Sequence, residues 1–192
     1  MAKLASKVYG DALFQLAVEE QKVDTFLSEI PALETAMEEN PELSAIMDHP
    51  KIIKEEKIRI LEDCFKGRIS DELCGLLTLA VEKERYKELP AIFAYTVGQL
   101  KEYKKIGVAE VTSAQELDET WKERIEKKLL ATTSYRTMEI TWRVDPGLLG
   151  GMVVRIGDRV VDGSLKFKLT ELTGGLNRIS LEQNEKVGER AS

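Results

Sequence analysis

The sequence contains few of the side chains that enzymes use for acid–base, nucleophilic or metal chemistry. Its 192 residues include one histidine and two cysteines. The histidine lies in Asp48-His49-Pro50, a pattern more typical of a helix end than of a general base. Cys64 and Cys74 fall where a helical pattern expects apolar residues, so we expect reduced, buried thiols rather than a disulfide. Two cysteines and one histidine cannot complete a zinc site without carboxylates.

Motifs for phosphate, metal and acyl-transfer chemistry are missing as well. The sequence has no glycine-rich loop ending in Lys-Ser or Lys-Thr, no HExxH, no CxxC and no G-x-S-x-G. The pair Gly150-Gly151 precedes an expected strand instead of opening a helix, so we interpret it as a turn or bulge. These absences predict a protein without catalytic residues, metal site, cofactor or small-molecule substrate.

Long apolar runs and an excess of positive charge are also lacking. No stretch of about 18 apolar residues occurs, so no transmembrane helix is expected. The start, Met1 to Lys7, lacks the apolar segment of a signal peptide. The net charge is −6 and the isoelectric point is near 5.1. This acidic balance argues against nucleic acid or an anionic membrane surface as the main partner.

What the first half of the chain does have is a run of apolar residues at helical spacing. The pattern predicts six helices with short links, an all-α N-terminal six-helix bundle over residues 1–105. Pro31 should kink the second helix. Asn40 and Ser70 should cap the third and fifth helices, while Gly67 should follow the fourth and Gly107 the sixth.

The apolar period changes from helical to alternating near Lys105–Gly107, where we place a domain boundary. The pattern after it predicts a small C-terminal α+β domain over residues 106–182, in the order β-α-β-β-β-α. Residues 183–192 carry no apolar pattern and are expected to form a mobile tail. The net charge is −5 for residues 1–105, from 15 basic and 20 acidic residues, which leaves −1 for the rest.

Local signals place the elements of this second domain. A capping box at Ser113-Ala114-Gln115-Glu116 should open its first helix. Gly157-Asp158 should form a two-residue hairpin turn with glycine first. Ser164 should cap the last helix, whose apolar positions are Leu165, Leu169, Leu172 and Leu176.

The first and fifth helices are apolar over a wider arc than a bundle helix needs. On a helical wheel each has apolar residues over roughly 180°, against the ~100° that packing on one side requires. Each helix could lie at the centre of the bundle. Alternatively, one flank of each could face the core while the other receives a partner helix.

The segment from Val144 to Leu165 closely resembles the C-terminal signature of the ATP synthase delta subunits and their mitochondrial relative, the oligomycin-sensitivity-conferring protein. The N-terminal half agrees, because Ala5 to Ala17 looks like the family's first helix and Glu82 to Pro90 resembles the link between its fifth and sixth helices. The resemblance covers nearly the whole chain. The residues that carry the C-terminal signature are Asp145, Gly150, Gly151, Gly157, Asp158, Asp162, Ser164 and Leu169.

This resemblance implies a non-catalytic subunit of the peripheral stalk of a rotary ATP synthase. In the family, the first and fifth helices form a groove for the amphipathic N-terminal helix of an alpha subunit, which favours the partner-helix explanation of the two wide arcs. The C-terminal domain is expected to meet the C-terminal ends of the b-type stalk helices. The protein would then reach the membrane only through the complex, on the cytoplasmic face of a bacterial cell membrane.

The candidate groove residues are apolar or small side chains of the first and fifth helices. We expect Ala12→Asp or Leu76→Asp to weaken binding of an alpha N-terminal peptide while leaving the domain folded. The full candidate set is Tyr9, Ala12, Leu13, Leu16, Leu73, Leu76, Leu77 and Ala80.

Two other functions fit the layout less well. An unrelated helix-binding adaptor could share it, but would lack the C-terminal signature. An RNA-binding α+β module would need a basic sheet face with exposed aromatic residues. The charge of −1 and the few aromatic residues of the second half argue against that module.

Overall fold

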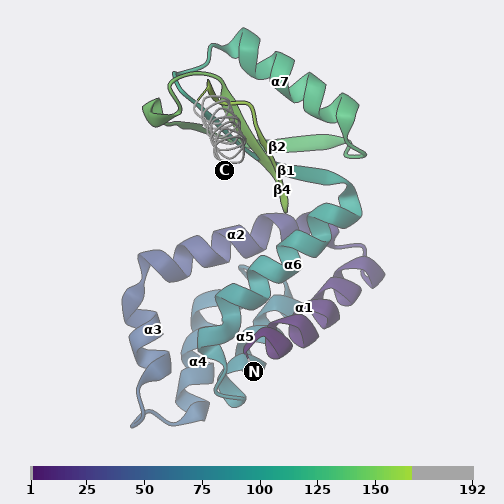
Figure 1. The fold of residues 1–192 in the computed structure, drawn as a ribbon. Helices are drawn as coiled ribbons and strands as arrows, with labels where there is room; N and C mark the ends of the chain where they lie inside the picture. The colour runs from purple at the N-terminus through teal and green to yellow at the C-terminus, as the bar shows by residue number, and fades with distance from the viewer. Residues whose placement is uncertain (1, 166–192) are drawn as a thin grey trace, which may run out of the picture. The chain divides into compact units, whose positions relative to one another are not determined.

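The chain folds as two compact units that meet between Lys104 and Lys105. A computed structural model describes the backbone of residues 2–165 and the side chains of residues 6–165. The first unit is helical, and the second is a small α/β unit with a four-stranded sheet (Figure 1).

The helical unit is built from two pairs of closely packed helices. Helix α1 lies along α6, and α4 lies along α5, while α2 also packs on α6 (Figure 1). The elements are α1 (Ala2–Glu19), α2 (Val23–Glu39), α3 (Pro41–Asp48), α4 (Lys54–Phe65), α5 (Asp71–Glu82), the 3₁₀ turn η1 (Tyr86–Glu88) and α6 (Leu89–Lys104).

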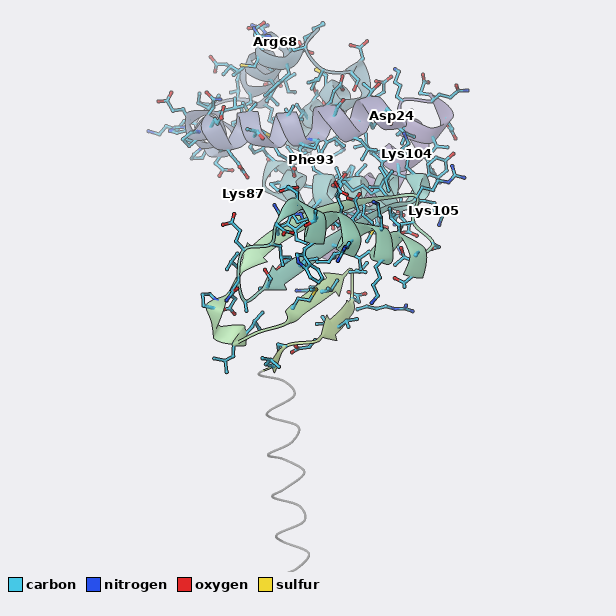
Figure 2. The ribbon with its side chains drawn as sticks, turned by 90° about the horizontal axis from the view of Figure 1, so that it is seen from above. Asp24, Arg68, Lys87, Phe93, Lys104 and Lys105 are labelled. Carbon is cyan, nitrogen blue, oxygen red and sulfur yellow. The ribbon has the colours of Figure 1, made fainter. Side chains whose placement is uncertain are left out.

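One core holds this unit together. Phe26 and Ile30 of α2, Leu77 of α5 and Phe93 of α6 are fully buried in it. Each such side chain contributes about 1.5–3 kcal/mol through removal of apolar surface from water. Phe93 lies in the interior of the helical unit, whereas Asp24 lies at its surface (Figure 2).

A glycine lets α1 and α6 approach closely. A Cβ atom at Gly10 would lie 2.4 Å from Cδ1 of Tyr95. The Tyr95 hydroxyl donates a hydrogen bond of 2.8 Å to Oδ1 of Asp11. At the far end of α6, Phe14 packs edge-on against Tyr103 with ring centroids 5.8 Å apart. One side of α1 is therefore fixed against α6 along most of its length.

Several predicted helix ends are in place, but their capping bonds are not all formed. Helices α3 and α5 begin directly after Asn40 and Ser70, yet neither side chain accepts a capping hydrogen bond. The Asn40 amide instead donates to the carbonyl oxygen of Ala36 at 2.8 Å. Gly67 follows α4 with φ of +75°, as expected of a residue just past a helix end. Helix α2 continues through Pro31.

The second unit contains a mixed sheet in the order β2-β1-β3-β4. Strands β1 and β2 are parallel and connected through α7, while β3 pairs antiparallel with β1 and β4 antiparallel with β3. The elements are β1 (Ile106–Ser113), α7 (Glu119–Thr132), β2 (Thr137–Val144), the 3₁₀ turn η2 (Pro146–Leu148), β3 (Met152–Ile156) and β4 (Arg159–Asp162). Of the last predicted helix, Leu169, Leu172 and Leu176 lie outside the described residues, as does the tail.

The predicted capping box at Ser113 is wrong. Ser113 is the buried last residue of β1, and its hydroxyl donates to the carbonyl oxygen of Gln115 at 2.6 Å. Helix α7 begins at Glu119, after the N-cap residue Asp118, which accepts from the backbone N–H of Trp121 at 2.8 Å. The strand continues to Ser113 because pairing with β2 and β3 extends to that residue.

The predicted role of Gly107 as the end of the sixth helix is also wrong. Helix α6 ends at Lys104, and Lys105 makes the turn with φ of +59°. Gly107 lies inside β1, where a Cβ atom would stand 2.3 Å from the sulfur of Met138. Glycine is required there for close packing on β2 and on Tyr135, not for ending a helix.

Candidate functional site

Helix α1 has a buried face, an exposed face and a flank between them. Leu13 is buried, whereas Val8 and Ala12 are exposed and Tyr9 and Leu16 are half-buried. Tyr9, Ala12 and Leu16 are spaced i, i+3 and i+7, so they share one flank of the helix. Of the four candidates on α1, three thus keep apolar surface available to a partner, and Leu13 belongs to the core.

The candidates on α5 have a different placement. All four are buried, and they form the side of α5 that faces the core: Leu73, Leu76, Leu77 and Ala80. The most accessible of them is Leu76, at 8%. Most of the wide apolar arc of α5 therefore belongs to the interior of the unit, as the first explanation of that arc supposed. Leu79, next to Leu76 on the surface, is half-buried.

Two contacts connect α1 with α5, one at each end of the flank. The guanidinium of Arg85, just after α5, lies over the Tyr9 ring at 5.7 Å from its centroid. At the opposite end, Lys22 after α1 forms an ion pair with Glu72 in the first turn of α5. The two helices are thus antiparallel neighbours. Ten residues of helix lie between the contacts on each side, from Tyr9 to Glu19 and from Glu72 to Glu82, which is about 15 Å of helix.

These contacts also show which flanks of the helices face each other. Glu72, Leu76 and Leu79 are spaced i, i+4 and i+7, so the side of α5 that binds Lys22 also carries the two leucines. The side of α1 that carries Tyr9, which Arg85 covers, likewise carries Ala12 and Leu16. The apolar residues Tyr9, Ala12, Leu16, Leu76 and Leu79 lie between the two contacts, and we call them the candidate α1–α5 groove.

The charged pair at one end of this groove is electrostatically well matched. A hydrogen bond from Lys22 lowers the pKa of the Glu72 carboxyl, and the same bond raises the pKa of Lys22. Lys22 also lies 3.9 Å from Oε2 of Glu20. Because both members of the pair favour their charged forms, the pair holds the start of α5 beside the end of α1 at neutral pH.

Burial changes one expectation drawn from the sequence. Since Leu76 is buried, Leu76→Asp would place a carboxylate in the core, and we now expect that substitution to destabilise the unit. Ala12 is exposed, so Ala12→Asp remains a suitable test of binding. Two apolar residues with accessible surface are not in the candidate set, the exposed Val8 and the half-buried Leu79. Their apolar side chains lie within the wide arcs, but periodicity alone could not rank them above the buried leucines.

The first part of the C-terminal signature is a turn that positions β3. Asp145 accepts from the backbone N–H of Gly147 at 2.8 Å and opens the 3₁₀ turn η2. Leu149 then adopts φ of +59° and Gly151 φ of +78°. A Cβ atom at Gly151 would lie 2.4 Å from the backbone oxygen of Gly163, so the two segments cross in direct contact.

The second part of the signature closes the β3–β4 hairpin. Ile156 pairs with Arg159, which leaves a two-residue loop as predicted. Gly157 has φ of +54°, and Asp158 is not among the residues with positive φ, as expected of a turn with glycine first. Asp162 accepts from the backbone N–H of Ser164 at 2.9 Å. Six residues of the signature therefore have structural roles in turns and crossings: Asp145, Gly151, Gly157, Asp158, Asp162 and Ser164. Leu169 lies outside the described residues.

The described residues offer little for metal binding or membrane insertion. Between residues 2 and 165, no group of three or more histidine, cysteine or acidic side chains could hold a metal ion. Within the same range, no helix combines the length and apolar character needed to cross a membrane. The α1–α5 groove has apolar residues between two polar ends, a pattern typical of surfaces that bind an amphipathic helix.

Comparison with known proteins identifies the family. The model of the ATP synthase delta (OSCP) subunit family matches residues 5–176. The chain is 51% identical over 181 residues to ATP synthase subunit delta of Lachnoclostridium phytofermentans, covering 94% of this chain and 100% of that protein. It is 36% identical to the Carboxydothermus hydrogenoformans protein of the same name, covering 87% of this chain and 93% of that one.

A solved structure supports the fold. A chain of the Toxoplasma gondii mitochondrial ATP synthase hexamer aligns with a TM-score of 0.68 at 17% sequence identity, covering 89% of this chain and 96% of that chain. The family match spans most of the sequence, and the bacterial relatives exceed 30% identity over nearly their whole length. The chain therefore belongs to the ATP synthase delta (OSCP) subunit family.

Proposed function

We propose that this chain links the alpha/beta catalytic head of a rotary, proton-translocating ATP synthase to its b-type stalk helices and resists rotation of the head. Membership of the family makes it a structural stalk subunit of ATP synthase rather than a catalytic one. The helices of its first unit act as one bundle that binds the head, and its second unit binds the stalk. The observation that carries the proposal is the α1–α5 groove.

The proposed occupant of this groove is the amphipathic N-terminal helix of an alpha subunit. A groove of about 15 Å accommodates roughly 10 residues of helix, or nearly three turns. Leu16 and Leu79 supply apolar contacts, and exposed Ala12 leaves room for close approach of a helix backbone. Such a helix would bind by burial of its apolar face, with a negative change in heat capacity.

The fixed edges of the groove support a mechanical role. The α1 side is fixed to α6 through Gly10 and the Tyr95–Asp11 hydrogen bond. The α5 side packs along α4. Because α1 and α5 are already held in place before the partner helix binds, little of the binding free energy is spent on ordering these two helices.

The second unit is proposed to contact the C-terminal ends of the b-type helices at the cytoplasmic face of the membrane. A chain with one contact to the head and one to the stalk gains from effective concentration, because release of either contact leaves the other in place. The family match over both units supports the proposal that the first unit contacts the head and the second contacts the stalk.

The proposal is tested on membranes that carry an ATP synthase assembled without its delta subunit. Addition of this chain should retain the catalytic head on the membranes through a low-salt wash and restore proton pumping driven by ATP. The matched control is the same chain with Ala12→Asp. Heads that wash off equally with and without the wild-type chain would refute the proposed linking function.

A further inference from the structure

The second unit carries an apolar pocket at the start of α7, with a volume of about 550 Å³. It lies between the loop that leads from β1 into α7 and the turn that leads from η2 into β3. Its most exposed apolar side chains are Trp121, at 52%, and Leu149, at 69%. The half-buried Leu117 and Met152 also line it. We call this pocket the Trp121–Leu149 site.

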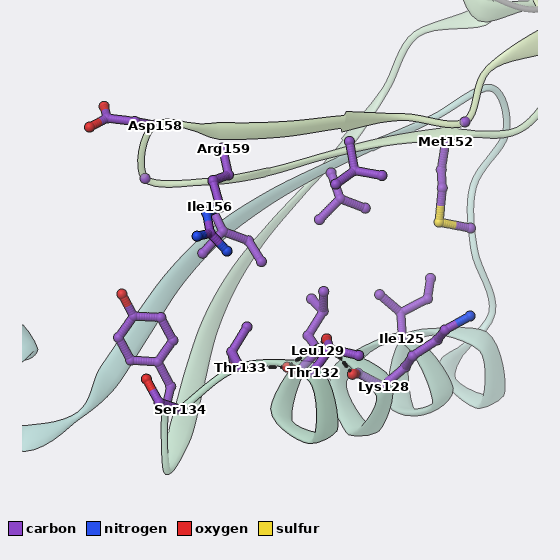
Figure 3. A pocket seen from close by; sticks show the side chains of 15 residues that line it. Ile125, Lys128, Leu129, Thr132, Thr133, Ser134, Met152, Ile156, Asp158 and Arg159 are labelled. Carbon is purple, nitrogen blue, oxygen red and sulfur yellow. Dashed lines mark hydrogen bonds between the residues drawn. The ribbon is translucent and has the colours of Figure 1, made fainter.

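The geometry of α7 explains why Trp121 is exposed. Ile125 and Leu129 point toward β3, with Ile125 nearer to Met152 and Leu129 nearer to Ile156 (Figure 3). Trp121 precedes Ile125 by four residues and therefore lies on the same side of α7, one turn earlier. Because β3 begins at Met152, the strand does not extend to the level of Trp121. The indole therefore lines an open pocket instead of packing on the sheet.

The backbone at Leu149 is unfavourable for a leucine. Its φ of +59° lies in the left-handed region, which glycine adopts without the steric penalty of a Cβ atom. Burial does not offset this penalty, because the Leu149 side chain is more than two-thirds exposed, at 69%. Backbone strain of this kind clusters at sites that bind other molecules. The strained, exposed leucine thus indicates, independently of the pocket, that its side chain contacts a partner.

Hydrogen bonds hold the two walls of the site in place. On the α7 side, Asp118 accepts from the backbone N–H of Trp121 at 2.8 Å. The backbone N–H of Ala114 donates to the carbonyl oxygen of Gly151 at 3.4 Å, which joins the α7 side to the β3 side. Since these walls are formed before a partner arrives, little binding free energy is spent on ordering them.

The charged residues that line the site are both acidic, Glu116 and Asp118. Hydrogen bonds from the Thr120 hydroxyl and from the backbone N–H of Trp121 lower the pKa of Asp118, so its carboxylate is charged at neutral pH. Arg124 lies over the Trp121 ring at 5.5 Å from its centroid, but it does not line the pocket. Charge complementarity therefore favours a partner with a basic residue beside its apolar contact.

The size of the site matches a short piece of helix. One helical turn with its side chains is about 11 Å across and 5.4 Å long, which gives a volume on the order of 500 Å³. The pocket, at about 550 Å³, thus accommodates one turn rather than the length of a helix.

We propose that the Trp121–Leu149 site binds one turn of a b-type stalk helix. A large apolar side chain of that turn inserts between Trp121 and Leu149, and a Lys or Arg next to it pairs with Glu116. The inference rests on the proposed function, and it adds the place and the chemistry of the contact with the stalk. Tryptophan is enriched among the few residues that supply most of the binding free energy at interfaces.

Titration of the full chain with the water-soluble part of the cognate b-type subunit tests the proposal. Asparagine adopts the left-handed conformation more readily than leucine, so Leu149→Asn should unfold at the same urea concentration as the wild type or higher. Its dissociation constant should nevertheless be at least about tenfold higher. The matched control is Val160→Asn, since Val160 is 58% exposed on β4 and does not line the site. The control should bind within about twofold of the wild type.

Two further variants separate the apolar contact from the charge. Trp121→Ala, at an exposed position, should stay folded and bind at least about thirtyfold more weakly. Glu116→Lys should weaken binding at least about fivefold at low salt, and this loss should shrink as salt is added. Unchanged or tighter binding by Glu116→Lys would overturn the assignment of a basic partner.

The wild-type titration distinguishes failure of the site from failure of the proposed function. If the wild type binds the stalk subunit and both Leu149→Asn and Trp121→Ala bind equally well, the site is wrong and the link to the stalk stands. If the control loses as much affinity as Leu149→Asn, the contact is not confined to the pocket and the site is wrong again. A folded wild-type chain that does not bind the stalk subunit would refute the proposed stalk contact and the site with it.

Discussion

Substitution of Ala12 by aspartate separates binding from folding in the α1–α5 groove. Ala12 is exposed in the middle of α1, between the half-buried Tyr9 and Leu16. In the free chain the new carboxylate would remain in water, and its main cost would be the lower helix propensity of aspartate, about 0.5–0.7 kcal/mol. We therefore expect Ala12→Asp to unfold at nearly the same urea concentration as the wild type.

The cost in the complex is larger, because a docked apolar helix would remove this carboxylate from water. Leaving a buried polar group without a partner costs about 1–3 kcal/mol, and more when it is charged. Protonation sets an upper limit, since moving the pKa from about 3.9 to above 7 costs about 4 kcal/mol. An expected loss of about 2–4 kcal/mol corresponds to a dissociation constant that is roughly 30- to 900-fold higher.

Calorimetric titration with a synthetic peptide of the first ~25 residues of the cognate alpha subunit measures this difference. The matched control is Ala32→Asp, the same chemical change at an exposed position of α2 that lies outside the groove. Ala32→Asp should bind like the wild type at one-to-one stoichiometry. If a folded Ala12→Asp chain binds the peptide as tightly as the control does, the α1–α5 groove is not the site of this helix.

Three further predictions concern stability. Gly151→Ala should destabilise the second unit by at least ~2 kcal/mol in urea unfolding, because alanine would be strained at φ of +78° and its Cβ would clash with Gly163. Gly98→Ala, at an exposed position of α6 with no neighbour near the new Cβ, should stabilise by about 0.5–1 kcal/mol, and a loss would contradict that assignment. Lys22 lowers the pKa of Glu72, so the pair contributes stability above the unfolded pKa near 4.3 and loses it as pH falls through the folded pKa. Between pH 7 and pH 3, Glu72→Gln should therefore lose less stability than the wild type.

Local patterns in the sequence were sufficient for most elements of the fold. The helical period of the first half, the alternating period of the strands and the Gly157-Asp158 turn all correspond to described elements. These features depend on residues close together in the chain. The glycine at 107 was misinterpreted because its role depends on Met138, more than thirty residues away, and nothing local distinguishes a helix-ending glycine from one that allows close packing.

The capping box illustrates a competition that sequence reasoning cannot decide. Ser113-Ala114-Gln115-Glu116 has the right residues to start a helix, but Asp118 offers an equally good cap five residues later. Pairing with β2 and β3 keeps Ser113 in the strand, and the helix then begins at the later signal. The hydrogen bonds of β1 with β2 and β3 therefore determine where the strand ends, and the local sequence pattern does not show these bonds.

The candidate groove residues on α5 are all buried, and the reason that the sequence does not distinguish them from surface residues is geometric. An apolar arc of about 180° does not show which part of it faces the core, or whether any part faces a partner. That assignment requires contacts that fix the rotation of each helix, and here they come from polar residues outside the apolar arc. The pairing of Lys22 with Glu72 and the stacking of Arg85 on Tyr9 orient the two helices. If these contacts define the groove, its residues at the surface are Tyr9, Ala12, Leu16 and Leu79, and the buried leucines of α5 act only by supporting them.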